Sequence, residues 1–266
     1  MLEQIDLEKV ADIAREAGKA VMEIYQRDFE VEFKADESPL TEADTRANEI
    51  ICRRLEELYS GVPMLSEENK EIPYETRKGW KEYWCIDPID GTKEFIKKNG
   101  EFTINIALVH DGEPVLGVVY APALDDLYTA KRGEGAWKNR QRLPLQKNNA
   151  PQKSLRVVAS KSHLSPETQE FIDALRAHTE EIEQVSKGSS LKLVMVAEGS
   201  ADIYPRLAPT MEWDTAAADA IVREAGKMSY RYEEGVDYLN ASAQELDALK
   251  LPYNKENLLN PWFVVV

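Results

Sequence analysis

The sequence has little of the chemistry on which several common protein classes depend. Only two of its 266 residues are cysteines, Cys52 and Cys85, so a disulfide framework is excluded and buried structural thiols are expected. The three histidines are His110, His163 and His178, and none lies in an acidic motif. Zinc-type ligation and a nucleophilic Ser-His or Cys-His pair therefore have no support.

Long apolar runs and an excess of basic charge are also lacking. No stretch approaches the roughly 18 apolar residues that a membrane-spanning helix needs, and the first residues lack the regions of a signal peptide. The chain has 33 lysines and arginines against 48 aspartates and glutamates, a net charge of −15. This charge argues against nucleic acid or an anionic membrane as a partner. We expect a soluble cytoplasmic protein, monomeric or homodimeric, with one large domain or two small ones.

One stretch, Trp84–Phe95 with the sequence WCIDPIDGTKEF, organises the rest of the chain. The apolar run from Tyr83 to Ile86 predicts a buried strand, and the Asp-Pro and Asp-Gly pairs that follow predict a turn. Two carboxylates, Asp87 and Asp90, therefore leave the end of one strand three residues apart. Carboxylate oxygens in this arrangement suit a hard cation such as Mg2+. A surface turn with solvated acids is the alternative that these pairs alone leave open.

Further acids stand at the ends of other predicted elements. Asp44 closes a capping box, Thr41–Asp44, that opens a helix, and an acid there often does no more than face the helix dipole. Glu67 and its neighbour Glu68 follow a short strand, where adjacent glutamates usually form a solvated turn. Asp214 opens another helix and by itself is most simply an N-cap.

Hydrophobic periodicity predicts alternating helices and strands on both sides of a polar boundary at 147–153. Before the boundary, β-rich segments predict an antiparallel meander, and the charged stretch 71–82 predicts an exposed connection. A Gly-Ser-Ser sequence, residues 188–190, opens a helix and predicts either a plain cap or an anion contact. The predicted elements are helices over 7–24, 41–58, 165–175 and 188–198, and strands over 29–33, 62–66, 83–86, 102–109, 114–121, 127–131, 155–159, 180–185 and 201–204.

These motifs together resemble the inositol monophosphatase family of Mg2+-dependent, lithium-sensitive phosphatases. Asp87–Thr92, DPIDGT, matches the first family motif, and Trp213–Ala217, WDTAA, matches the second. Ser38–Asp44, SPLTEAD, matches the segment whose aspartate helps to activate the attacking water. Glu67 stands 20 residues before Asp87, close to the family spacing of a metal-binding glutamate.

Two further segments are similar to one branch of that family, the 3'(2'),5'-bisphosphate nucleotidases. They are Lys93–Phe95, which extends the first motif, and Tyr253–Pro261 near the C-terminus. The resemblance implies an α/β fold, a layered αβαβα sandwich. It also implies two sub-domains: residues 1–147 with most metal ligands, and residues 148–266, which complete the site and bind the nucleotide.

The resemblance implies a role for individual residues. Glu67 would take part in catalysis. Thr92, hydrogen-bonded to Asp44, would take the proton of the attacking water in a proton relay. The implied metal ligands are Glu67, Asp87, the carbonyl of Ile89, Asp90 and Asp214. The implied substrate contacts are Gly91, Thr92, Ser189, Lys192, Arg206 and Asp214.

The resemblance also implies a reaction. Clustered carboxylates would repel one another, and two or three Mg2+ ions, with Mn2+ as a substitute, relieve this repulsion. The implied substrate is 3'-phosphoadenosine 5'-phosphate, cleaved to AMP and phosphate in sulfur assimilation, with 3'-phosphoadenosine 5'-phosphosulfate as a second substrate. Some relatives are peripheral on the inner membrane face, which nothing in this sequence supports.

Two alternatives remain at this point. The first is the same chemistry on inositol monophosphate or fructose 1,6-bisphosphate, against which the Lys93–Phe95 extension argues. The second is a non-catalytic protein that binds a cation or phosphate, against which Thr92 and Asp44 argue because binding alone needs no proton relay.

Overall fold

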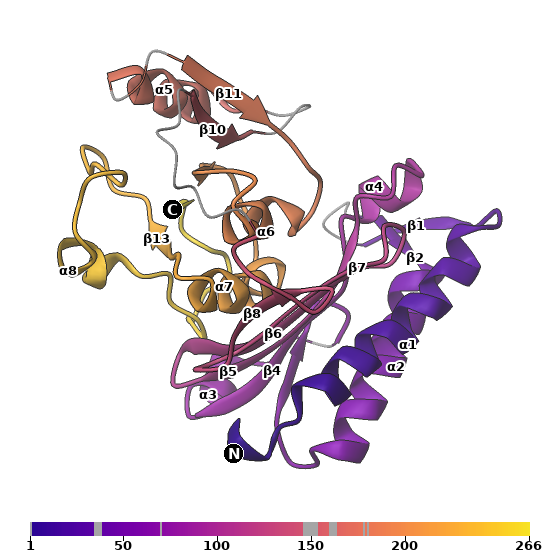
Figure 1. The fold of residues 1–266 in the computed structure, drawn as a ribbon. Coiled ribbons are helices and arrows are strands. Elements are labelled where there is room, and N and C mark those ends of the chain that lie inside the picture. Colours follow the sequence, from indigo (N-terminus) through magenta and orange to yellow (C-terminus); the bar gives the residue numbers. More distant parts are fainter. Residues whose placement is uncertain are drawn as a thin grey trace.

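The computed structural model describes residues 2–34, 39–69, 71–145, 154–159, 164–177, 179 and 181–266. Its centre is a seven-stranded sheet (Figure 1) in which β3 is parallel to β4 and every other pair is antiparallel. The predicted meander is thereby confirmed. In spatial order the strands are β3 (Met64–Ser66), β4 (Glu82–Asp90), β5 (Thr103–His110), β6 (Glu113–Ala121), β7 (Asp126–Lys131), β8 (Gly135–Lys138) and β9 (Gln141–Arg142).

The apolar run in β4 reflects burial on both faces of this sheet. Trp84 and Ile86 pack in one core, whereas Tyr83 and Cys85 pack in the core on the opposite face. A strand covered on both sides has no solvent face, so its sequence does not alternate between apolar and polar residues. The strand is longer than predicted, because it continues past Pro88 to the end of the DPID sequence with a shift in register against β5.

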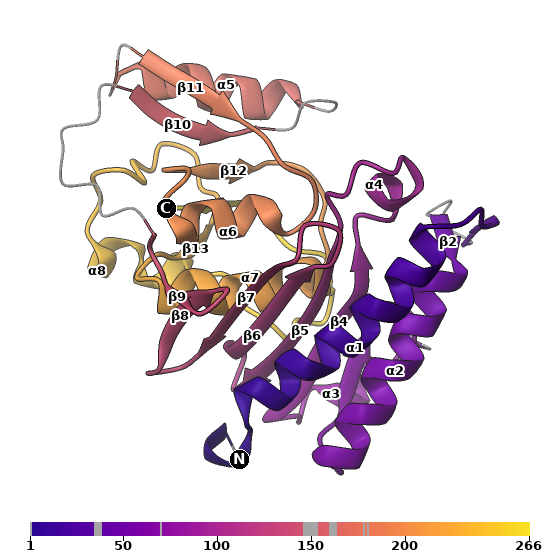
Figure 2. The same ribbon diagram turned by 45° about the vertical axis from the view of Figure 1, so that its right-hand side comes forward.

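Helices cover both faces of the sheet (Figure 2). On one face lie α1 (Leu7–Tyr25) and α2 (Glu42–Leu58), joined through the hairpin of β1 (Val31–Phe33) and β2 (Pro39–Thr41). On the other face α7 (Glu212–Glu224) packs closely, with α6 (Leu191–Glu198) beside it. At Gly117 a Cβ atom would lie 2.1 Å from the carbonyl oxygen of Ala217 in α7, so only glycine allows this approach.

The second half of the chain adds two small sheets and an outer helix layer. The parallel pair β10–β11 and the antiparallel sheet β12–β14–β13 are linked by a bridge between Val157 and Ile203. The layers follow one another in the order α1 and α2, the seven-stranded sheet, α6 and α7, the two small sheets and the outer helix α5 (Figure 2). This order confirms the layered αβαβα sandwich. The bounds are β10 (Ser154–Val158), β11 (Glu181–Val185), β12 (Tyr204–Arg206), β13 (Ser229–Arg231), β14 (Phe263–Val265), α3 (Tyr74–Arg77), α4 (Thr92–Ile96), α5 (Pro166–Ala174) and α8 (Ala243–Leu246).

Several predictions about this architecture need correction or lie outside the described residues. The strand expected at 201–204 lies at Tyr204–Arg206, so Arg206 is a strand residue. The stretch 71–82 is not a wholly exposed connection, because Arg77 in α3 is 2% exposed. The boundary at 147–153, Ser38, His163 and His178 lie outside the described residues. Among the helices of the described residues, none has the length and the apolar run needed to cross a membrane.

Candidate active site

The candidate site lies where β4 ends and several helices begin. Asp44 is the third residue of α2, Thr92 is the first of α4 and Asp214 is the third of α7, while Ser189 and Ser190 directly precede α6. Helix N-termini carry partial positive charge and free N–H groups, so acids are favoured in these positions. The predicted capping box that opens α2 is confirmed, with the Asp44 carboxylate accepting from the Thr41 N–H at 2.8 Å.

The turn between β4 and α4 depends on Gly91. This residue has a φ of 91°, in the left-handed region that side chains avoid, and it is the N-cap of α4. The chain therefore reverses only after Asp90, and both aspartates of the motif belong to the strand. The prediction that the Asp87-Pro88 pair ends the strand is wrong: in β4 the backbone accommodates Pro88 by the register shift between Asp87 and Asp90.

Three carboxylates from three different elements meet at this point. Glu67 directly follows β3, Asp87 lies in β4 and Asp214 in α7, and one oxygen of each lies within 4.8 Å of the others. Asp87 is 1% exposed, and its Oδ1 accepts the Ile89 N–H at 3.0 Å. The structure thus brings together three of the predicted metal ligands, and it is Glu67, not Glu68, that faces the two aspartates.

Burial and mutual repulsion disfavour negative charge on these acids. Burial, with added repulsion from Glu67, Asp90 and Asp214, raises the pKa of Asp87 well above its ordinary value. Burial and the nearby Asp90 raise the pKa of Asp214 to about 8. A bound divalent cation would offset both effects, because its charge favours the ionised form of each carboxylate.

A lysine that the sequence reasoning did not single out contacts this cluster. Lys34 lies 2.8 Å from Glu67 Oε1 and 2.6 Å from Glu68 Oε1. Burial alone would lower the pKa of Lys34, but the two glutamates together raise it above its ordinary value. Because 33 residues separate Lys34 from Glu67, no local pattern in the sequence predicts this contact.

Asp90 is held by the serines that precede α6. Its Oδ2 accepts from the Ser189 hydroxyl at 2.8 Å and from the Ser190 hydroxyl at 2.7 Å. The Ser190 oxygen also lies 2.7 Å from the carbonyl oxygen of Asp214. These contacts tie together β4, α6 and α7. Ser190 was missed at the sequence level, although it stands beside the predicted Ser189.

The predicted contact between Thr92 and Asp44 is present. The Thr92 hydroxyl lies 3.2 Å from Asp44 Oδ1 and 3.3 Å from the carbonyl oxygen of Ile89. Burial raises the pKa of Asp44, against the opposing effect of its hydrogen bonds with Thr41. A hydroxyl held between a carboxylate and a carbonyl is oriented, as a proton-transfer group must be.

A cavity of about 320 Å³ opens beside Asp90 and Asp214, and its lining includes four cationic side chains. Both predicted specificity residues, Lys192 and Arg206, line it, and burial lowers the pKa of Lys192. The other lining residues are Gly91, Lys93, Glu94, Lys97, Ser189, Ser190, Leu193, Tyr204, Thr210, Thr215 and Phe263. Sequence reasoning did not assign Lys93 of α4 or Lys97, which directly follows α4, to the site, although Lys93 is part of the extended first motif.

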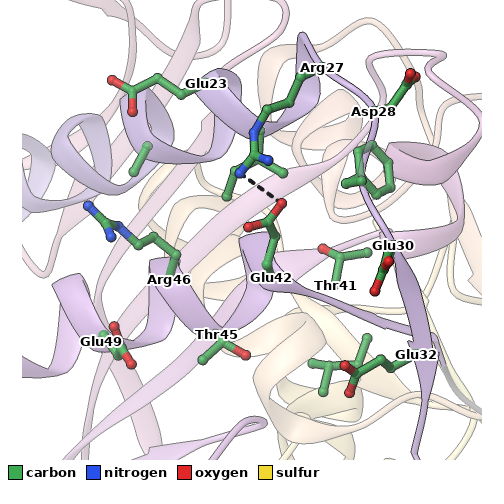
Figure 3. Close-up of a pocket in the computed structure, with 14 residues that line it drawn as sticks. Glu23, Arg27, Asp28, Glu30, Glu32, Thr41, Glu42, Thr45, Arg46 and Glu49 are labelled. Carbon is green, nitrogen blue, oxygen red and sulfur yellow. Dashed lines mark ion pairs between the residues drawn. The ribbon is translucent and has the colours of Figure 1, made fainter.

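A second cavity, of about 870 Å³, is lined by the end of α1, by strands β1 and β2 and by the start of α2, and it contains none of the site carboxylates. Figure 3 shows its acidic lining, with an ion pair of 2.8 Å between Arg27 and Glu42. Most of the lining side chains are exposed. The acids that line this cavity form no metal-binding cluster among the described residues, and it is not the candidate active site.

The donor set at the β4 end fits a hard divalent cation. Its side-chain donors are all carboxylate oxygens, and cysteine and histidine are absent from the cluster found among the described residues. Oxygen-only sites of this kind suit Mg2+, which is bound through carboxylates together with substrate phosphate oxygens. The carboxylates can therefore hold a hard cation at the end of β4, the strand that the Thr92 hydroxyl directly follows.

This fold and this acidic site are consistent with the protein family that the sequence of the chain matches. Residues 3–259 match the inositol monophosphatase family, and the chain belongs to that phosphatase family. It is 42% identical to the 3'(2'),5'-bisphosphate nucleotidase CysQ of Escherichia coli strain K12, over 97% of this chain and 98% of that protein. It is 37% identical to the protein of the same name from Haemophilus influenzae, over 98% of this chain and 92% of that protein.

Solved structures agree with these sequence relatives. The crystal structure of CysQ from Bacteroides thetaiotaomicron superimposes with a TM-score of 0.83 at 44% identity, covering 97% of this chain and 96% of that one. The SuhB protein of Bartonella henselae gives a TM-score of 0.72 at 26% identity, covering 97% and 92%. The predicted family, its bisphosphate nucleotidase branch and the layered fold are thereby confirmed.

Proposed function

We propose that this protein is a 3'(2'),5'-bisphosphate nucleotidase that removes the 3'-phosphate of 3'-phosphoadenosine 5'-phosphate, giving AMP and phosphate. The proposal rests on one observation: two features occur together in one site. One is the set of three carboxylates within 4.8 Å of one another. The other is the adjoining cavity with four cationic side chains, which suits a substrate that carries a second phosphate away from the carboxylates. The CysQ relatives, which carry the nucleotidase name, support the same activity.

The proposed cofactor is Mg2+, in two or three ions, with Mn2+ as a substitute. The ligands would be Glu67, Asp87, the carbonyl of Ile89, Asp90 and Asp214, of which three already converge. When bound, Mg2+ supplies a positive charge that polarises the phosphoryl group, acidifies the attacking water and stabilises the leaving oxygen in an in-line displacement.

The residues of the chain then have distinct proposed roles. The Thr92 hydroxyl takes the proton of the attacking water as its own proton passes to the Asp44 carboxylate, which lies 3.2 Å away and orients it. Glu67 takes part in catalysis by acting on the same water, in addition to its proposed role as a ligand of the cation. The N–H groups of Gly91 and Thr92, at the start of α4, hold phosphate oxygens. Ser189 supports Asp90 through a 2.8 Å hydrogen bond and lines the cavity on the substrate side.

Specificity is assigned to the cavity side chains Lys192 and Arg206, which would contact the second phosphate. By the same contacts the site would accept 3'-phosphoadenosine 5'-phosphosulfate, and its physiological place would be sulfur assimilation. The two sub-domains, 1–147 and 148–266, would both contribute residues to the active site. The first would supply Glu67 and the motif of β4, and the second would supply Asp214 and the specificity residues.

The experiment that tests the proposal is a panel of phosphate esters assayed with Mg2+. It compares 3'-phosphoadenosine 5'-phosphate, 3'-phosphoadenosine 5'-phosphosulfate, inositol 1-phosphate and fructose 1,6-bisphosphate by kcat/KM for phosphate release. The highest value is expected for 3'-phosphoadenosine 5'-phosphate. A higher value for inositol 1-phosphate or fructose 1,6-bisphosphate would overturn the substrate assignment, and no release from any ester would favour a non-catalytic binding protein.

A further inference from the structure

The Asp214 carboxylate is oriented by the backbone N–H of Met211. Asp214 Oδ2 accepts the Met211 N–H at 2.8 Å, which closes the first turn of α7. Met211 is the N-cap, and its side chain makes no capping hydrogen bond, unlike the serine, threonine, aspartate or asparagine that usually occupies this position. Met211 therefore contributes only its backbone to the start of α7, and side chains elsewhere in the chain can support that backbone.

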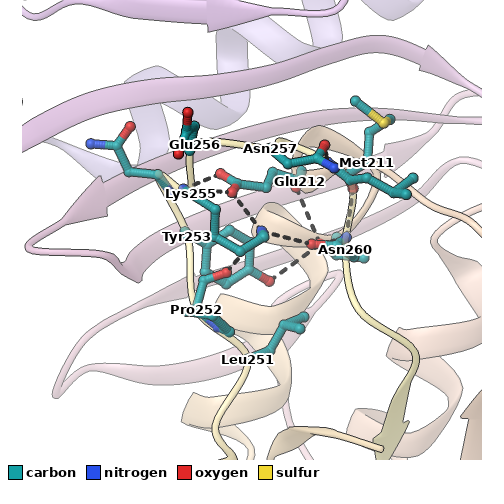
Figure 4. A network of polar contacts seen from close by, with 12 residues as sticks. Met211, Glu212, Leu251, Pro252, Tyr253, Lys255, Glu256, Asn257 and Asn260 are labelled. Atoms are coloured by element: carbon teal, nitrogen blue, oxygen red, sulfur yellow. Dashed lines mark hydrogen bonds and ion pairs between the residues drawn. The ribbon is translucent and has the colours of Figure 1, made fainter. Parts of the chain in front are cut away.

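The C-terminal segment supplies this support through Asn260, which is 4% exposed. Figure 4 shows its side-chain amide directed at the start of α7, where Nδ2 donates to the Met211 carbonyl oxygen at 2.8 Å. The same nitrogen lies 3.1 Å from Thr215 Oγ1, and the Asn260 N–H donates to the Thr210 carbonyl oxygen at 2.8 Å. Met211 is therefore held on both sides, by Asp214 at its N–H and by Asn260 at its carbonyl.

A buried ion pair fixes the orientation of the Asn260 amide itself. Lys255 Nζ lies 2.6 Å from Oε1 of Glu212, whose side chain is fully buried, and 3.3 Å from Asn260 Oδ1 (Figure 4). The Glu212 carboxylate also accepts the backbone N–H groups of Asn254 at 2.8 Å and Lys255 at 3.0 Å. With its oxygen facing the ammonium group, the Asn260 amide must present its nitrogen to the Met211 carbonyl.

We infer that Asn260 is a positioning residue for Asp214 and acts through the backbone of Met211 to hold that carboxylate in the geometry that a divalent cation requires. The inference rests on the proposed function only in that Asp214 is taken as a cation ligand. Partners that orient a metal ligand typically change metal affinity about 10- to 100-fold when they are removed. The competing explanation is that Asn260 only fastens the C-terminal segment to α7.

Asn254 offers a matched control in the same segment. Its side chain joins Arg77, accepting from Nη1 at 3.1 Å and donating to the Arg77 carbonyl oxygen at 2.9 Å. No hydrogen bond among the described residues links that side chain to Met211 or Asp214. Asn254 also has a φ of 61°, so alanine there adds backbone strain, and Asn254→Ala tests a loss of stability without a loss of the Met211 contact.

The experiment measures Mg2+ binding to the full-length protein by isothermal titration, with thermal unfolding in parallel. Asn260→Ala is expected to weaken Mg2+ binding about 10-fold or more, while Asn254→Ala lowers the unfolding temperature and leaves Mg2+ affinity within about 2-fold of the unaltered protein. If Asn260→Ala does not fold, Asn260→Asp keeps the oxygen that faces Lys255, removes the donor to Met211, and is expected to show the same loss.

Equal Mg2+ affinities in the Asn260 and Asn254 variants would overturn the positioning role, even if both proteins are less stable. If the unaltered protein takes up no Mg2+, the proposed function itself is overturned, and the inference with it. The measurement on the unaltered protein therefore separates a failure of the inference from a failure of the proposed function.

Discussion

Arg206→Ala is expected to lower activity on the bisphosphate far more than activity on a monophosphate. Arg206 ends β12 and lines the cavity together with Asp90 and Asp214. Its Nη2 donates to the Pro209 carbonyl oxygen at 3.0 Å. Because a guanidinium group has five N–H donors, this bond leaves other donors for a phosphate that enters the cavity.

The magnitude follows from the bond that is removed. A hydrogen bond to a charged group contributes about 1.5–3 kcal/mol, and each 1.36 kcal/mol is a factor of about ten in kcat/KM. Arg206→Ala should therefore reduce kcat/KM for 3'-phosphoadenosine 5'-phosphate by about 10- to 100-fold. For 3'-AMP, which lacks the 5'-phosphate, it should change kcat/KM by less than about 3-fold.

Arg231 provides the control for this substitution. In the sheet β12–β14–β13, Phe263 of β14 is the strand-pairing partner of Arg206 in β12 and of Arg231 in β13. Each arginine also donates from Nη2 to a backbone carbonyl oxygen. Arg231 does not line the cavity, so Arg231→Ala should leave the ratio of the two kcat/KM values unchanged. Steady-state phosphate release on both nucleotides measures this ratio. Equal losses on the two substrates in Arg206→Ala would refute the specificity argument and assign Arg206 to support of the fold or of the carboxylates.

Three further outcomes are expected. Thr92→Val should lower kcat by about 10²- to 10⁴-fold and leave calorimetric Mg2+ binding unchanged, because only the proton-accepting hydroxyl is lost; an unchanged kcat would contradict the relay. Li+ should inhibit phosphate release much more strongly than Na+, because it would occupy a Mg2+ position; equal rates with Li+ and K+ at matched ionic strength would count against this. Burial and Asp90 raise the pKa of Asp214 from 3.8 to about 8, so the folded metal-free protein holds a proton that the unfolded chain releases. The unfolding temperature of the metal-free protein, measured in EDTA, should therefore fall as the pH rises from about 4 toward 8. This fall should be less steep in Asp214→Asn. A rise in unfolding temperature over this pH range would contradict the raised pKa.

Local patterns predicted much of the fold, whereas the residues of the candidate site were named mainly through the family resemblance. The capping box over Thr41–Asp44 marks the start of α2, because a helix start leaves free N–H groups that nearby side chains must satisfy. The continuous apolar run of β4 marks a strand buried on both faces. The grouping of Glu67, Asp87 and Asp214 could be expected only through the family resemblance, since their separation in the sequence carries no distance information.

Other features depend on contacts between distant segments. Arg77 lies in a charged stretch that indicated an exposed connection, yet its guanidinium group is buried against the backbone of Lys255 and Glu256. Glu212 lies at a helix start and is fully buried, because the Lys255 ammonium group and the backbone N–H groups of Asn254 and Lys255 pair with its carboxylate. The end of β4 was misjudged because Asp-Pro usually breaks a strand, and here a register shift accommodates it.

Phosphate release from 3'-phosphoadenosine 5'-phosphate, by protein treated with EDTA and then titrated with Mg2+, is the most direct test of the proposed function. We expect no measurable release in EDTA and full recovery with Mg2+ or Mn2+. We also expect Asp90→Asn to remain folded and to lose turnover by orders of magnitude at saturating Mg2+. Undiminished release in EDTA would contradict the central claim that these carboxylates work through bound divalent cations.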